Sequence, residues 1–167
     1  MYTKLTVIGL LSLVFTGCGQ AYDTHPEQGD SPLASAAMQN RLLVICTGDD
    51  TGATGLPLYA EQYDEVAKDW AGYLERDMIV VWLRDDVLTN WTPFLNESGE
   101  VEVRQLAESQ DIAGLRARTN CAPGSRGVHL IGKDTGLKNT WRTSVSNKDV
   151  FAIIDAMPMR QQEMRSN

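Results

Sequence analysis

The chain is poor in the residues that carry most thiol and metal chemistry. Its 167 residues include three cysteines and two histidines. The cysteines stand at positions 18, 46 and 121, so the Cys-x-x-Cys motif of dithiol reductants is absent. His129 is the only histidine of the folded part, and no two-histidine metal set can be built from it. We therefore assign no catalytic residue, no metal ligand and no cofactor.

Positive charge and long apolar runs are also scarce. The chain has 15 basic and 22 acidic residues, a formal net charge of −7. Removing an N-terminal leader takes away only Lys4, and 14 basic against 22 acidic residues then gives −8. This charge argues against nucleic acid and anionic membrane surfaces as partners. The apolar run from Leu5 to Phe15 is too short for a comfortable membrane span.

Residues 1–17 have the features of a signal peptide. Lys4 and the apolar run are followed by Phe15-Thr16-Gly17-Cys18, which resembles a lipobox with Phe in place of the usual Leu. We expect cleavage before Cys18 and lipidation of that cysteine; a plain secretory signal and an uncleaved anchor are the alternatives. Gly19 suggests, by resemblance to Gram-negative lipoproteins, sorting to the outer membrane, with a secreted or periplasmic protein as the alternative. Residues 18–40 then form the lipidated start and a flexible tether.

Two apolar runs, 41–46 and 78–83, predict strands that are buried on both faces. Between them, apolar residues recur at three- and four-residue steps from the Leu56-Pro57 start to Leu74, which predicts one helix of about four turns and a parallel βαβ unit. Residues 84–108 are the least readable. Asn96 to Gly99 could turn a small hairpin there, whose first arm is at best an edge strand because of Pro93.

The C-terminal third predicts a helix at 110–118, a hairpin at 127–142 and a last helix. Lys133 to Gly136 supplies the turn of the hairpin, with a glycine free to take positive φ. Ser146 and Asp149 form a capping box for the last helix, and Pro158 should kink or end it.

The order β-α-β, irregular segment, β-β-α is that of a thioredoxin-like domain. The strings Ile131-Gly-Lys-Asp-Thr-Gly-Leu-Lys138 and Ile154-Asp-Ala-Met-Pro-Met-Arg-Gln-Gln-Glu-Met164 resemble the signature of a bacterial domain of unknown function in the DUDES superfamily. The animal relatives of that superfamily are secreted, matrix-associated proteins. The resemblance covers residues 41–164, leaves a tail at 165–167, and implies an α/β, thioredoxin-like fold with a central mixed sheet flanked by helices. It implies no established activity.

Cys46 and Cys121 are the remaining candidates for thiol chemistry. On a thioredoxin-like fold they come near one another at one edge of the sheet, as a structural disulfide, two buried free thiols or a redox-active pair. The slot at 51–54, where thioredoxins place their reactive cysteine, contains none. This departure counts against ordinary thiol–disulfide exchange.

Three further places have residues that could form a site. Asp49 and Asp50 could offer hard oxygen ligands to an ion, but neither has the partners that a calcium loop needs. His129, mid-strand with apolar neighbours, is expected to be a packed, hydrogen-bonded core residue. Met159 and Arg160 could present a surface to a partner, or finish the core and pair with Asp155 or Glu163.

The sequence thus predicts a lipid-anchored, periplasm-facing, thioredoxin-like module with a non-catalytic binding or structural role in the bacterial cell envelope. An envelope protein would be its partner. The alternative is a thiol oxidoreductase or peroxide-responsive protein that uses Cys46 and Cys121.

Overall fold

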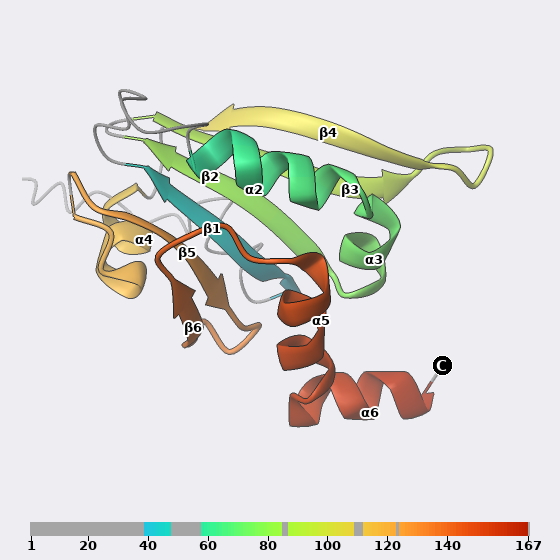
Figure 1. The fold of residues 1–167 in the computed structure, drawn as a ribbon. Coiled ribbons are helices and arrows are strands. Elements are labelled where there is room, and N and C mark those ends of the chain that lie inside the picture. The colour runs from blue at the N-terminus through green and yellow to red at the C-terminus, as the bar shows by residue number, and fades with distance from the viewer. Residues whose placement is uncertain (1–38, 48–57, 85–86, 109–111, 123, 167) are drawn as a thin grey trace, which may run out of the picture.

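The computed structural model describes residues 39–47, 58–84, 87–108, 112–122 and 124–166. Within these ranges six strands form one sheet in the order β4-β3-β2-β1-β5-β6 (Figure 1). The strand pairs are antiparallel except for β1 and β2, which are parallel. The expected α/β class with a central mixed sheet flanked by helices is confirmed.

Strand β1 (Arg41–Thr47) lies in the middle of the sheet, and all seven of its residues are buried. It pairs with β2 (Met78–Arg84) on one side and with β5 (Arg126–Ile131) on the other. Because side chains alternate along a strand, Leu43 and Ile45 face one side and Leu42, Val44 and Cys46 face the other. Both faces are covered, which explains why the run is apolar without alternation.

The predicted single helix between β1 and β2 is two helices, α2 (Leu58–Ala67) and α3 (Trp70–Glu75). Asp69 breaks it: its φ of −151° leaves the helical region, and its carboxylate accepts a hydrogen bond from Gly72 N at 2.8 Å. An aspartate that caps a new helix competes with continuation of the old one. The expected apolar face nevertheless packs on the sheet, and the Leu56-Pro57 start lies outside the described residues.

The segment that was hardest to interpret forms a long hairpin, β3 (Val87–Leu95) and β4 (Val101–Glu108). The turn after Asn96 is confirmed, since Asn96 N donates to Glu100 O at 2.9 Å. The expectation of an edge strand at Pro93 is wrong for the strand as a whole, because β3 lies between β2 and β4. Near Pro93, however, β3 is an edge strand as expected, because its pairing with β2 ends at Trp91, opposite Val80.

The second hairpin, β5 with β6 (Leu137–Trp141), is confirmed, but its turn uses a different residue from the one expected. The positive φ is at Thr135, 61°, rather than at a glycine. Asp134 Oδ1 accepts a hydrogen bond from Gly136 N at 3.1 Å, and Gly132 N donates to Gly136 O at 3.0 Å. These bonds hold Thr135 in a conformation that a β-branched residue rarely adopts.

The remaining helices are α4 (Ile112–Thr119), α5 (Asn147–Asp155) and α6 (Pro158–Ser166). Ser146 caps α5 as predicted, with Asp149 N donating to Ser146 Oγ at 3.2 Å and that hydroxyl donating to Asp149 Oδ2 at 2.7 Å. Pro158 follows the end of α5 and opens α6, where its missing N–H breaks no helical bond.

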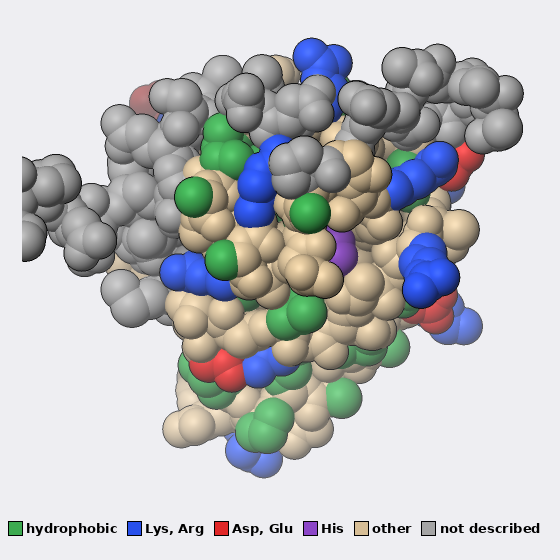
Figure 2. Space-filling model, turned by 90° about the vertical axis from the view of Figure 1, so that its left-hand side faces the viewer, with side chains coloured by type: hydrophobic (Ala, Val, Ile, Leu, Met, Phe, Trp, Pro, Cys, Tyr) green, Lys and Arg blue, Asp and Glu red, His purple; other side chains and the backbone are tan. Residues whose placement is uncertain are grey.

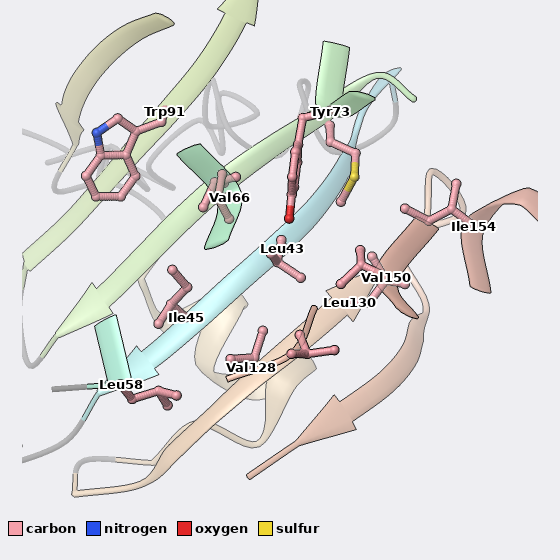
Figure 3. Packing of buried hydrophobic residues seen from close by; sticks show 13 residues of the cluster. Leu43, Ile45, Leu58, Val66, Tyr73, Trp91, Val128, Leu130, Val150 and Ile154 are labelled. Atoms are coloured by element: carbon pink, nitrogen blue, oxygen red, sulfur yellow. The ribbon is translucent and has the colours of Figure 1, made fainter. Parts of the chain in front are cut away.

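The sheet has one hydrophobic cluster on each face. The cluster shown in Figure 3 joins β1 and β5 to residues of α2, α3 and α5, among them Val66, Tyr73, Val150 and Ile154. The cluster on the opposite face contains Leu115 of α4 together with Cys46 and Cys121. The helices are therefore divided between the two faces, with α4 on the cysteine side.

Candidate functional site

The two cysteines of the domain are joined by a disulfide between the end of β1 and the segment after α4. Their Cα atoms lie 6.1 Å apart, and the bridge closes a sequence separation of 75 residues. The end of α4 sets the place of Cys121. Asn120 has a φ of 53°, and Cys121 N donates to Arg116 O at 3.1 Å, the backbone pattern of a Schellman helix end.

The disulfide is buried. Cys46 and Cys121 are each 1% exposed and belong to the cluster that includes Leu42, Val44 and Leu115. Arg116 Nη1 donates to Cys121 O at 2.8 Å and fixes the backbone beside the bridge. Exchange requires a thiolate to reach a disulfide sulfur in line, and these neighbours close that approach. The arrangement suits a cross-link between sheet and helix.

His129 has the surroundings of a core residue. It is 6% exposed, and its Nδ1 lies 3.1 Å from Thr140 Oγ1 on β6. Burial lowers the pKa of the ring, so the neutral form is favoured. The expectation of a packed, hydrogen-bonded histidine is confirmed.

A group of ion pairs gathers where α6 meets the N-terminal end of β1. We call it the C-terminal ion cluster; its cations are Arg41, Arg76, Lys133 and Arg160, and its carboxylates are Glu75, Asp77, Asp155 and Glu163. Burial acts to raise the pKa of Glu163, but hydrogen bonds from Lys133 and Arg41 outweigh it and lower that pKa. Four cations face four carboxylates, so the cluster has no formal net charge.

Arg41 is the most enclosed member of the C-terminal ion cluster. Its side chain is 1% exposed; Nη1 donates to Arg76 O at 2.8 Å, and Nη2 donates to Glu163 Oε2 at 3.0 Å. The bond to Glu163 ties the first strand to the last helix across 122 positions of sequence. It is a structural tie between the two ends of the domain.

Arg160 lies in the same cluster rather than on the surface. Its side chain is 4% exposed, Nη2 donates to Glu75 Oε1 at 2.7 Å, and Nε lies 3.5 Å from Asp155 Oδ1. Of the two alternatives for Arg160, these contacts favour pairing with Asp155 and Glu163 over a guanidinium that faces a partner. Met159 differs, since it is 51% exposed. Of the two residues proposed as a partner surface, only Met159 is available to one.

Met159 borders an open hollow of about 510 Å³ beside α6, which is also lined by Glu75, Asp77 and Gln162. The charged groups around it are already paired within the C-terminal ion cluster. On the face shown in Figure 2, hydrophobic side chains are scattered between charged ones and form no single large patch. Met159 also lines a second hollow of about 200 Å³ together with Met157 and Pro158, so it belongs to a small apolar area at the α5–α6 junction.

Two buried polar residues were not singled out by sequence reasoning. Gln62 is fully buried and forms two hydrogen bonds with the backbone of Val145. Its Oε1 accepts from Val145 N at 2.8 Å, and its Nε2 donates to Val145 O at 3.1 Å. Arg41 was included only as the first residue of an apolar strand. Their partners lie 83 and 122 positions away. No local pattern indicates such pairs, although a polar residue on an apolar helix face was a signal for Gln62.

Some predicted site residues lie outside the described ranges. Cys18, with its leader and tether, is one, and Asp49 and Asp50 are the others. Among the described residues, no group of three or more histidine, cysteine, aspartate or glutamate side chains could hold a metal ion. Within the same ranges, no helix has the length and hydrophobicity needed to cross a membrane.

Comparison with known proteins gives one match. Neither the curated proteins nor the solved structures contain a significant match to this chain. Residues 32–163 match the family described as "Domain of unknown function (DUF4174)", a range that includes the sheet, the disulfide and every residue of the C-terminal ion cluster. The chain therefore belongs to the family of domains of unknown function DUF4174.

Proposed function

We propose that this protein is a lipid-anchored, thioredoxin-like module with a non-catalytic binding or structural role in the bacterial cell envelope. The observation that carries the non-catalytic part is the burial of the disulfide, since both cysteines are 1% exposed. A redox-active pair must expose one sulfur to its substrate. The bridge instead joins the central strand to the segment after α4.

The thioredoxin-like part of the proposal is supported by strand order. Four of the strands run β2-β1-β5-β6, with β1 parallel to β2 and antiparallel to β5, and with β5 and β6 forming a hairpin. This is the arrangement expected of β-α-β followed by β-β-α. The hairpin β3–β4 extends that sheet beyond β2.

The anchoring part rests on the sequence Thr16-Gly17-Cys18 behind an apolar leader. An acyl-modified Cys18 would hold the domain at the membrane through the polar segment that follows it. Gly19 supports the outer membrane as its place. The partner in the envelope would be a protein, and exposed Met159 is one contact that the described C-terminal helix offers it.

The non-catalytic role is tested by thiol labelling and turnover of the purified full chain. We expect Cys46 and Cys121 to resist alkylation in the native protein and to label only after reduction in denaturant. Peroxide consumption and insulin reduction should remain at background. Turnover by the wild type that disappears in Cys46→Ala would replace this proposal with a thiol oxidoreductase.

The anchor is tested by Cys18→Ser, which removes the acylated sulfur. We expect the variant to move from the membrane fraction to the soluble fraction and to keep its leader, because the lipoprotein peptidase requires the modified cysteine. Fractionation and mass spectrometry of the intact protein measure both effects. Thr16→Ser is the matched control and should be processed as the wild type; an unchanged mass and location for Cys18→Ser would exclude lipidation.

A further inference from the structure

Strand β4 is the last strand on its side of the sheet. In Figure 1 the hairpin β3–β4 reaches out past α3, and no other described strand lies along the outer side of β4. An outer strand carries a row of backbone groups that can pair with another chain.

The hairpin turn determines which backbone groups face outward. Asn96 N donates to Glu100 O at 2.9 Å, so these two residues form a hydrogen-bonded pair. Hydrogen-bonded and non-hydrogen-bonded pairs alternate along an antiparallel ladder. In the register of β3 and β4, Val101, Val103 and Gln105 therefore fall in the pairs that exchange no backbone hydrogen bond with β3. Their N–H and C=O groups point to the open edge.

Pro93 is consistent with this assignment. It lies opposite Val103, in a pair that exchanges no hydrogen bond, and proline has no N–H to give. Pro93 is tolerated in the ladder for this reason.

The charges on the edge are self-complementary. Glu102 and Arg104 flank Val103, point to the same face of the strand and are both exposed. Glu102 Oε1 accepts a hydrogen bond from Asn96 Nδ2 at 2.8 Å, and the Arg104 guanidinium lies 5.0 Å from the ring centroid of Phe94. Both side chains are exposed, and each makes one contact with the β3 side of the hairpin.

We propose that β4 pairs with β4 of a second copy of this chain, antiparallel, about a two-fold axis at Val103. Val103 would then exchange both backbone hydrogen bonds with Val103 of the second copy, and Val101 would pair with Gln105. Glu102 of each copy lies opposite Arg104 of the other, in the non-hydrogen-bonded positions where side chains are closest. The two sheets join into one.

Charge selects this register over its neighbours. The backbone N–H and C=O groups that point to the open edge can pair only with the same groups of the second copy. The register can therefore shift only in steps that keep Val101, Val103 and Gln105 paired among themselves. One step in one direction puts Glu102 opposite Glu102, and one step in the other puts Arg104 opposite Arg104. Both place like charges across the strand pair, which is unfavourable. The register centred on Glu102 would also set Glu100 opposite Arg104, but it keeps the Glu102–Glu102 contact, whereas the register centred on Val103 pairs Glu102 with Arg104 twice and brings no like charges together.

The same register gives exposed apolar groups a neighbour. Val101 is 37% exposed on the face where Val103 packs against the core. Across the new strand pair, Val101 lies diagonal to Val103 of the second copy, within reach of side-chain contact. The pairing thus adds apolar contact to the backbone bonds and the two charge pairs.

Sedimentation equilibrium of the full chain in density-matched detergent tests the proposal. We expect the wild type to form a concentration-dependent dimer. Glu102→Arg and Arg104→Glu should each raise the dimer Kd by about tenfold or more, because each change places like charges opposite one another. The double variant Glu102→Arg/Arg104→Glu should restore the dimer. An equimolar mixture of the two single variants should also associate, since every cross-strand pair is then of opposite charge.

Circular dichroism melts control for folding, since both changed side chains are exposed. If a single variant fails to fold, Gln105→Pro decides instead: it removes an outward N–H without touching the ladder to β3, and it should weaken the dimer. The proposal is overturned by a wild type that stays monomeric up to about 0.1 mM, by single variants that dimerise as the wild type does, or by a dimer unchanged in Gln105→Pro.

Discussion

Replacing both Cys46 and Cys121 by alanine is expected to lower the free energy of unfolding by about 4 kcal/mol in the chain-entropy description of cross-links. The bridge closes a separation of 75 residues, so its loss frees a long loop in the unfolded chain. It also removes two side chains from a buried cluster, where small cavities add to the cost. Urea titration followed by tryptophan fluorescence measures the change.

Two further readouts identify the cause of that loss. The m-value should rise in the double variant, because an unfolded chain without the cross-link exposes more surface. Wild-type protein that is kept reduced, without alkylation, should unfold at nearly the same urea concentration as the double variant. An oxidised wild type that is no more stable than the double variant would show that the bridge contributes nothing.

Arg160→Ala is expected to lower the free energy of unfolding by about 2 to 3 kcal/mol. Removing one member of a buried ion pair costs about 3 to 5 kcal/mol, and the cost here is lower because the carboxylates around Arg160 are partly exposed and have other cations. Met159→Ala, one residue earlier on the same helix, should change stability by under about 0.5 kcal/mol, since Met159 is half exposed.

The pH dependence of stability gives an independent check on the same cluster. The pKa of Glu163 in the folded protein is below its ordinary value of 4.5, because Lys133 and Arg41 hold its charged form. Its stabilising contribution is complete above that ordinary value and is lost as the pH falls through the folded pKa. Lys133→Ala, which removes one of the two cations that hold this charged form, should therefore lose most relative to the wild type at neutral pH and less at pH 3. Equal melting temperatures for Arg160→Ala and Met159→Ala would contradict the buried cluster.

Local patterns were enough to predict most of the elements. The continuous apolar run at 41–46 indicated a strand covered on both faces, and β1 is one. Ser146 and Asp149 indicated the start of α5, because a capping box satisfies backbone donors that only a helix end leaves free. Errors arose where two local signals competed. Asp69 broke a periodic helix by capping a new one, and Thr135 took the conformation expected of a glycine.

The candidate sites were likewise predicted only in part. Sequence alone determined that the domain has two cysteines, one histidine and no Cys-x-x-Cys motif, and these counts limit its chemistry whatever the fold. It also determined the alternation of Glu102, Val103 and Arg104, because side chains of a strand point to opposite faces in turn.

Only the tertiary structure decided what these residues touch. The burial of the disulfide depends on α4 packing against the end of β1, and the burial of Arg41 depends on Glu163, 122 positions away. The edge position of β4 depends on the order of all six strands. The physical reason is range: capping and periodicity act within one or two turns, whereas burial, ion pairing and edge exposure are set by segments that meet only when the chain has folded.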